Sequence, residues 1–222
     1  MMGKLFIIGV GPGDPELMTI KARNTIISAD VIACPERDGK PGVAFLIAEK
    51  AVPEISSKEL LLISFPMEKG SCTVEDAHRT AAEDIISQLE KGKTVAFLTL
   101  GDPSLYSTAS FIIERIPKDR YHIEMTSGIP SFCAVSSKLL ISLASGNTPV
   151  LITTAEEADC SFPGSLVIMK AGNHLRTIKN KLSGSGRKAF LVENCGLPNE
   201  RIYESIESFP EESGYFSTII VI

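Results

Sequence analysis

Features that mark several specialised classes of protein are missing from this 222-residue sequence. The cysteines are widely spaced and include no C-x-x-C pair; they are Cys34, Cys72, Cys133, Cys160 and Cys195. This usage disfavours a disulfide scaffold or a zinc site and favours reduced thiols, so we expect a cytoplasmic protein without a bound metal. No apolar run approaches the ~20 residues that span a bilayer, so no membrane association is expected. With 44% apolar and 22% charged residues, the composition is that of an ordinary globular protein.

The sequence also lacks an excess of basic residues. Lys and Arg number 22 against 27 Asp and Glu, and the net charge of −5 disfavours a nucleic-acid partner. Acidic residues are absent from residues 160–192, which we call the acid-free stretch; its basic residues are Lys170, Arg176, Lys179, Lys181, Arg187 and Lys188. Two interpretations stay open: a solvated face balanced by acids elsewhere in space, or a surface that meets a polyanionic ligand.

The first half of the chain alternates short apolar runs with helical patterns. The runs predict strands at residues 4–9, 30–34, 60–64, 94–100 and 121–126. Apolar residues at helical spacing predict helices at 19–29, where Thr19 is the expected N-cap, and at 74–89. This alternation predicts an α/β domain with a mostly parallel sheet over residues 1–145.

After about residue 145 the pattern becomes richer in strands. Short strands are predicted at residues 149–153, 165–170, 188–192, 201–204 and 215–222, with one clear helix at 173–183. Residues 145–147 (Ser-Gly-Asn) have the composition of a linker. We therefore expect a second, smaller α/β domain with a mixed sheet over residues 146–222.

Three glycine-rich loops follow predicted strands of the first domain, at residues 9–14, 101–107 and 127–131. Ligands of open α/β sheets bind beyond the carboxyl ends of the strands, and glycine permits a close backbone approach there. One such loop is most simply a tight strand-to-helix turn, but three on one edge indicate the floor of a ligand site.

Familiar phosphate-binding and catalytic motifs are missing from these loops. Asp14 stands where G-x-G-x-x-G needs its last glycine, and no Gly-Lys-Ser/Thr loop is present. NAD and ATP are therefore not supported as ligands. No Ser/His/Asp set is evident either; His78 and His122 are expected to be structural, and His174 is the one histidine worth testing.

Several motifs, in the order in which they occur along the chain, resemble those of a known family. The motifs are GVGPGDPELMTIKA (9–22), ADVIACP (29–35), FPMEKG (65–70), VAFLTLGDPSLYSTAS (95–110), SGIPSFCAV (127–135) and LVIMKAGN (166–173). They resemble the tetrapyrrole methylases over most of the chain, most densely from residue 4 to 135. Within that family the sequence is most similar to the branch that methylates C-20 of precorrin-2 or of its cobalt complex, cobalt-factor II.

The resemblance implies a two-domain α/β homodimer that binds S-adenosylmethionine in a cleft between the domains. The residues it assigns to the methyl donor are Pro12, Gly101, Asp102, Leu105, Tyr106, Pro130, Ser131, Met169 and Cys195. Three positions depart from the common family pattern: Ser127 replaces a proline, Pro130 a threonine, and Cys195 a glycine. Because Pro130 has no hydroxyl group, it cannot make the hydrogen bond expected of the threonine that the family commonly has there.

The substrate that the resemblance implies is a tetrapyrrole polycarboxylate. The residues expected to contact it are Gly11, Gly13, Tyr106, Ser107, Thr108 and Arg176. The implied reaction is S-adenosylmethionine-dependent methyl transfer to C-20 in cobalamin (corrin) biosynthesis, and no proton-accepting residue is identified. The alternatives are methylation at another ring position or of uroporphyrinogen, and, less favoured, a non-enzymatic ligand-binding module.

Overall fold

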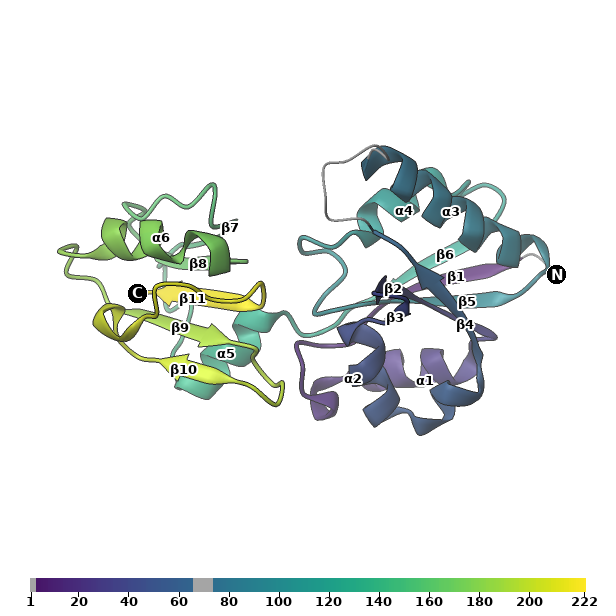
Figure 1. Cartoon of the computed structure of the whole chain (residues 1–222), viewed down its shortest axis with the longest axis horizontal. Helices are drawn as coiled ribbons and strands as arrows, with labels where there is room; N and C mark the ends of the chain where they lie inside the picture. The colour runs from purple at the N-terminus through teal and green to yellow at the C-terminus, as the bar shows by residue number, and fades with distance from the viewer. Residues whose placement is uncertain (1–2, 66–73) are drawn as a thin grey trace. The chain divides into compact units, whose positions relative to one another are not determined.

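The apolar runs of the first half form one sheet in the computed structural model, which describes residues 3–65 and 74–222 (Figure 1). Its strands are β1 (Lys4–Gly9), β2 (Val31–Arg37), β3 (Lys40–Pro41), β4 (Glu59–Ile63), β5 (Thr94–Thr99) and β6 (His122–Thr126). The order is β3-β2-β5-β1-β6, with β4 also paired to β2. Only the short β2–β3 pairing is antiparallel among these described strands, which confirms the expected mostly parallel sheet.

Helices cover both faces of this sheet (Figure 1). They are α1 (Ile20–Ser28), α2 (Val43–Ala51), α3 (Val74–Glu90) and α4 (Ala109–Arg115), with short 3-10 turns η1 (Pro15–Leu17) and η2 (Pro53–Ser57). Figure 1 shows α3 and α4 on one face and α1 and α2 on the other. Leu5 and Phe97 pack into the α3/α4 core, while the alternate residue Ile8 is also fully buried. Burial on both faces explains why these strands are apolar throughout.

Helix α2 is among the elements that the sequence patterns did not predict. Its sequence is VAFLIAEKA, and Ala44, Phe45, Ile47 and Ala48 are all buried. Apolar residues therefore lie around much of a nine-residue helix, so the 3.6-residue period that marks an amphipathic helix is weak. By contrast, α1 begins where expected, because the Thr19 hydroxyl accepts a hydrogen bond from Ala22 N at 3.2 Å and caps the helix.

A second sheet forms from the strands of the C-terminal part of the chain. They are β7 (Val150–Thr154), β8 (Ser165–Met169), β9 (Ala189–Glu193), β10 (Arg201–Tyr203) and β11 (Ser217–Val221), in the order β10-β9-β11-β8-β7. The β7–β8 pair is parallel, and the pairs that join β8, β11, β9 and β10 are antiparallel. The sheet is thus mixed, as expected.

The helices of this second unit are α5 (Ser131–Leu139) and α6 (Leu175–Leu182), with 3-10 turns η3 (Gly172–His174) and η4 (Ile206–Ser208). Ile219 and Val221 of β11 pack in the core with α6, whereas Thr218 meets Ser131 of α5 on the alternate face. The chain accordingly divides into Met1–Pro130 and Ser131–Ile222. This division precedes the boundary expected after residue 145, because α5 packs on β11.

The basic side chains of the acid-free stretch are largely engaged within the second unit. Arg187 donates to the carbonyls of Phe162 at 2.9 Å and Gly164 at 2.5 Å, with longer contacts to Cys160 and Val221 at 3.4 Å. Lys179 Nζ donates to Phe209 O at 2.9 Å, and Lys181 Nζ to Ala158 O at 3.4 Å. These three cations contact backbone carbonyls of their own unit, so a surface that meets a polyanionic ligand, one of the two interpretations left open, cannot include all of the stretch.

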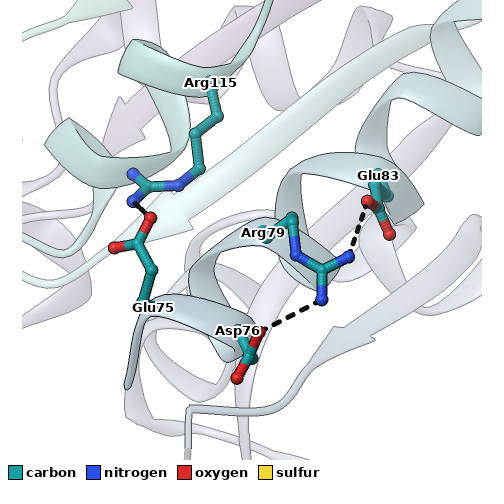
Figure 2. Close-up of polar contacts among 5 residues, drawn as sticks. All are labelled: Glu75, Asp76, Arg79, Glu83 and Arg115. Atoms are coloured by element: carbon teal, nitrogen blue, oxygen red, sulfur yellow. Dashed lines mark hydrogen bonds and ion pairs between the residues drawn. The ribbon is translucent and has the colours of Figure 1, made fainter. Parts of the chain in front are cut away.

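His78 has the structural role expected of it. Its ring is 6% exposed and stacks on Phe111 at 4.4 Å between centroids with 9° between planes. Beside it, Glu75 of α3 pairs with Arg115 of α4 at 2.5 Å (Figure 2). Arg79 pairs along α3 with Asp76 and Glu83 in the same view. Burial lowers the pKa of His78 below 6.5, and Arg115 lowers it further, while Glu75 opposes the shift.

The lowered pKa predicts a pH dependence of stability that arises at His78. Because the folded chain resists protonation, the unfolded chain binds more protons as the pH falls below the ordinary histidine pKa of 6.5. The stability that His78 contributes in this way is fully present above pH 6.5 and is lost as the pH falls through the lower pKa of the histidine in the folded chain. Urea unfolding from about pH 7.5 to 5.5 should show a smaller loss of stability for His78→Phe than for wild type. Equal slopes for His78→Phe and wild type would contradict the prediction.

The carbonyl contacts of Arg187 predict that replacing this side chain destabilises the protein, whereas replacing its neighbour Lys188 does not. Arg187→Ala leaves several carbonyls without their charged donor and should lower the free energy of unfolding by about 3 kcal/mol. Lys188→Ala removes a neighbouring but exposed cation and should change it by less than about 0.5 kcal/mol. Urea titration of both variants measures the difference, and similar small effects would show that the carbonyl contacts contribute little.

Candidate functional site

The three glycine-rich loops begin side by side at the carboxyl ends of β1, β5 and β6. The parallel registers pair Gly9 of β1 with Thr99 of β5, and Ile8 of β1 with Thr126 of β6. Helix α1 follows β1 on one face, and α4 follows β5 on the other (Figure 1). Neighbouring strands whose chains leave to opposite faces create the crevice in which open α/β sheets bind ligands. The alignment inferred from sequence is therefore present within the first unit.

Glycines allow the backbones of these loops to touch. Gly11 and Gly101 form an antiparallel bridge, with Gly101 N donating to Gly11 O at 2.8 Å and Gly11 N to Gly101 O at 3.3 Å. A Cβ on Gly128 would lie 2.1 Å from Gly101 O and 2.8 Å from Gly9 C. A Cβ on Gly9 would lie 2.5 Å from Gly101 O. Three loops are thus locked into one floor because their contact points carry no side chain.

Asp102 connects two of the loops through its carboxylate. Oδ1 accepts from Ser104 N at 2.8 Å and Ser104 Oγ at 2.5 Å, and Oδ2 accepts from Gly128 N at 3.0 Å. The residue is 9% exposed, so these donors replace most of the water that a carboxylate would otherwise need. Sequence reasoning missed Ser104, whose signal is the Asp-x-Ser spacing of a side-chain-stabilised turn.

The remaining residues of the second loop divide between an exposed tip and a helix start. Tyr106 adopts a left-handed backbone conformation, with φ of +50°, and is 46% exposed. Leu105 and Thr108 are half-buried. Ser107 Oγ lies 2.9 Å from Thr99 Oγ1 and accepts from Ala109 N at 3.2 Å, so it organises the start of α4. Tyr106 is therefore the residue of this group that offers the most surface.

The first and third loops are joined by the N-terminus of α1. Thr19 Oγ1, which caps α1, also donates to Ser127 O at 3.4 Å. Gly11, Pro12 and Gly13 are buried beneath this arrangement. Thr126 Oγ1 at the end of β6 is buried with no hydrogen-bond partner among the described residues. Sequence reasoning missed Thr126, because a strand threonine gives no sign of its burial.

The predicted residues of the second unit gather at one edge of its own sheet. Met169 ends β8 and pairs with Thr218, whose Oγ1 lies 3.3 Å from Ser131 Oγ. Cys195 follows β9 and is 6% exposed. The predicted residue Arg176 is exposed on α6. This edge also holds a buried carboxylate that sequence reasoning missed: Glu193 accepts from Ser213 Oγ, and from Tyr203 OH at 3.4 Å.

Within residues 3–65 and 74–222, no three His, Cys, Asp or Glu side chains are grouped so as to hold a metal ion. In the same ranges no helix combines the length and apolar character needed to cross a membrane. The motif residues Pro66 and Met67 lie outside the described ranges.

Comparison with known proteins gives one family match and several full-length relatives. The model of the Tetrapyrrole (Corrin/Porphyrin) Methylases matches residues 4–209. The chain is 30% identical to the cobalt-precorrin-2 C(20)-methyltransferase of Salmonella typhimurium, over 100% of this chain and 97% of that protein. It is 29% identical to the precorrin-2 C(20)-methyltransferase of a Sinorhizobium species, over 99% and 95%.

The chain is also similar to a methyltransferase that acts on a different tetrapyrrole and to a solved structure. An S-adenosyl-L-methionine-dependent uroporphyrinogen III methyltransferase of Methanosarcina barkeri is 30% identical over 75% of this chain and 66% of that protein. A solved structure of a putative cobalamin synthesis related protein from Corynebacterium diphtheriae has a TM-score of 0.81 at 19% identity, covering 100% of this chain and 98% of that one. At that identity the structural match establishes the fold alone.

The close backbone contacts among the three loops predict that adding a methyl group at Gly128 destabilises the protein. Gly128→Ala places a Cβ against backbone atoms of Gly101 and Gly9, which cannot rotate away, and should lower the free energy of unfolding by about 3 kcal/mol. Gly214→Ala is the matched control, because its Cβ would meet nothing within 4 Å; it should change stability by less than about 1 kcal/mol. Urea unfolding tests both, and equal effects would contradict the packing argument.

Proposed function

The chain belongs to the tetrapyrrole (corrin/porphyrin) methylases, which makes it an S-adenosylmethionine-dependent methyltransferase, and from that premise we propose that it methylates C-20 of precorrin-2 or of its cobalt complex in cobalamin biosynthesis. The observation that carries the C-20 position is the pair of relatives named for this reaction. Each aligns with nearly the whole of this chain and at least 95% of its own length.

We propose that the loop floor of the first unit receives the methionine end of the methyl donor through Pro12, Gly101, Asp102, Leu105, Tyr106 and Pro130. The floor fits such a ligand because its glycines let three loops meet at the carboxyl ends of the strands, where ligands of open α/β sheets bind. The unpartnered Thr126 hydroxyl adds hydrogen-bonding capacity at the same edge. The Asp102 carboxylate already accepts three hydrogen bonds, so we assign it to positioning the loops.

In the second unit we propose that Ser131, Met169 and Cys195 contribute to binding the donor's adenosine. Met169 and the Ser131–Thr218 pair lie at the same sheet edge, and a thioether offers polarisable apolar contact to an aromatic base. Cys195 follows β9 and is buried, which suits a packing contact better than a chemical role.

The chemistry asked of these side chains is modest. S-adenosylmethionine supplies an electrophilic methyl group on a cationic sulfur, and transfer requires that group to lie in line with the attacking carbon. Holding two reactants in such a geometry can supply roughly 7–11 kcal/mol of the barrier. A floor built from rigid backbone, tied by the Gly11–Gly101 bridge and the Asp102 carboxylate, suits this positioning role.

For the substrate we propose contacts from Gly11, Gly13, Tyr106, Ser107, Thr108 and Arg176. Tyr106 and Arg176 present exposed side chains, whereas Gly11 and Gly13 are buried and would shape the floor. Ser107 is engaged in starting α4, so its backbone is better placed to contribute than its hydroxyl. We also propose that the protein acts as a cytoplasmic homodimer, for which the reduced-thiol composition and the family resemblance are the support.

A second candidate function is methylation of a different tetrapyrrole, such as uroporphyrinogen III. The Methanosarcina barkeri relative favours it, since its identity is as high as that of the C-20 relatives. That relative, however, aligns with a smaller share of both chains. We therefore rank the C-20 reaction first.

A transfer assay tests the proposal. The protein is incubated with isotopically labelled S-adenosylmethionine and precorrin-2, cobalt-factor II or uroporphyrinogen III, and the products are analysed by mass spectrometry and carbon NMR. We expect one labelled methyl group at C-20 of precorrin-2 or cobalt-factor II, and none on uroporphyrinogen III. Donor binding is measured in parallel by equilibrium dialysis.

The outcomes separate the candidates. Label on uroporphyrinogen III, or at a carbon other than C-20, assigns the chain to another reaction of the same family. Donor binding without transfer to any of the three substrates would overturn the tetrapyrrole C-20 assignment.

A further inference from the structure

The hairpin formed by β2 and β3 extends past the end of the first sheet. Ala33 of β2 pairs with Phe97 of the neighbouring strand β5, so Pro35 stands level with Thr99, where β5 ends. Strand β2 continues to Arg37, and because a strand rises about 3.3 Å per residue, the hairpin projects about 7 Å past the carboxyl end of β5. This is the end of the sheet at which the glycine-rich loops begin.

The hairpin is held in shape at its tip and at its base. Asp38 and Gly39 form the two-residue turn, and both have positive φ, +54° and +72°. A type I′ turn requires positive φ at both central residues, and Asp-Gly is a favoured sequence for it. At the base, Gly42 N donates to Pro35 O at 2.9 Å, and a Cβ on Gly42 would lie 2.7 Å from the same oxygen. The residues between base and tip therefore start from defined backbone positions.

Two cations share one face of this hairpin. Arg37 of β2 lies opposite Lys40 of β3, and opposite residues of antiparallel strands share a face. Alternation along β2 places Arg37 on the face of Val31 and Ala33, which pack in the core with α3 and α4. The loop at residues 101–107 follows β5, the neighbour of β2, and leads to α4 on that same face. The two cations therefore lie on the side of the sheet that this loop also occupies.

The charges of the hairpin are only weakly compensated. The Arg37 side chain is 88% exposed, and its Nε lies 4.0 Å from Asp38 Oδ2 in the turn. The Lys40 ammonium group makes no hydrogen bond or ion pair with residues 3–65 or 74–222. Glu36, the other acidic residue of the hairpin, lies opposite Pro41 on the alternate face. Like charges directly opposite each other on paired strands repel, so an anion bound between the two cations would relieve an unfavourable contact.

We propose that Arg37 and Lys40 form a carboxylate-binding subsite that holds one acidic side chain of the tetrapyrrole substrate beside the loop at residues 101–107. The proposal rests on the tetrapyrrole substrate class proposed above. A guanidinium group binds a carboxylate through two parallel hydrogen bonds, and an adjacent ammonium group adds a third donor and a second positive charge. The pairing of two cations across the hairpin thus becomes favourable when the carboxylate is bound.

Binding of a porphyrin polycarboxylate tests the subsite. Uroporphyrin III is titrated into the whole chain in the presence of S-adenosylhomocysteine, and the Kd is read from the change in porphyrin absorbance at several NaCl concentrations. The variants are Lys40→Gln, Lys40→Arg and the double variant Arg37→Gln/Lys40→Gln, with Lys91→Gln as the matched control. Lys91 is an exposed lysine between α3 and β5, at the opposite end of the same sheet. The Kd for S-adenosylhomocysteine and the Tm are measured for every variant.

We expect Lys40→Gln to raise the Kd for uroporphyrin about threefold at low salt and the double variant to raise it about tenfold, with both differences shrinking as salt increases. Lys40→Arg should stay near wild type, and Lys91→Gln should match it. The Tm of Lys40→Gln should equal or exceed that of wild type, because the substitution removes the repulsion between the opposite cations. The Kd for S-adenosylhomocysteine should be unchanged in all of them.

Four results would overturn the subsite, and they differ in what they leave intact. Wild-type affinity for uroporphyrin in the double variant, or an equal loss of affinity in Lys91→Gln, would overturn the subsite and leave the proposed function intact. Weaker binding of S-adenosylhomocysteine with unchanged binding of uroporphyrin would assign the two cations to the donor's carboxylate instead. A joint loss of Tm and of both affinities would give the hairpin cations a structural role. Failure of the wild-type protein to bind uroporphyrin while it binds S-adenosylhomocysteine would overturn the proposed substrate class itself.

Discussion

The close approach of three backbones at Gly9, Gly101 and Gly128 is the constraint on which the first unit's site depends. Because no Cβ intervenes, the loops after β1, β5 and β6 touch directly and are joined by the Gly11–Gly101 bridge. The helices that follow β1 and β5 lie on opposite faces of the sheet, an arrangement that marks the end of an open α/β sheet where ligands bind. A surface of rigid backbone groups suits a reaction whose main requirement is the alignment of two reactants.

Charged groups in this protein serve two different purposes. Asp102 and Arg187 bind backbone groups: the carboxylate joins two site loops, and the guanidinium holds the loop between β7 and β8 against β11. Other charged groups pair with one another, as Arg115 of α4 does with Glu75 of α3. The net charge of −5 therefore says little about what any one charged side chain contacts.

Much of the architecture could be predicted because its signals are local. The apolar runs of β1 and β5 and the Thr19 cap each act within a few residues, and the structure confirms them. Helix α2 could not be found, since apolar residues also lie on its exposed side, as Leu46 does, and weaken the helical period. The unit boundary also differed from expectation, because a linker composition at residues 145–147 does not reveal that α5 packs on β11.

The sequence by itself determined the family, the alternation of strands and helices, and the three glycine-rich loops, because motifs and periodicity are properties of consecutive residues. Only the tertiary structure decided which charged side chains are engaged internally. Arg187 and Lys188 are consecutive cations of the acid-free stretch, yet Arg187 contacts carbonyls up to 34 residues away in sequence, while Lys188 is exposed. Hydrogen bonds between distant segments depend on folding, and no local pattern encodes them.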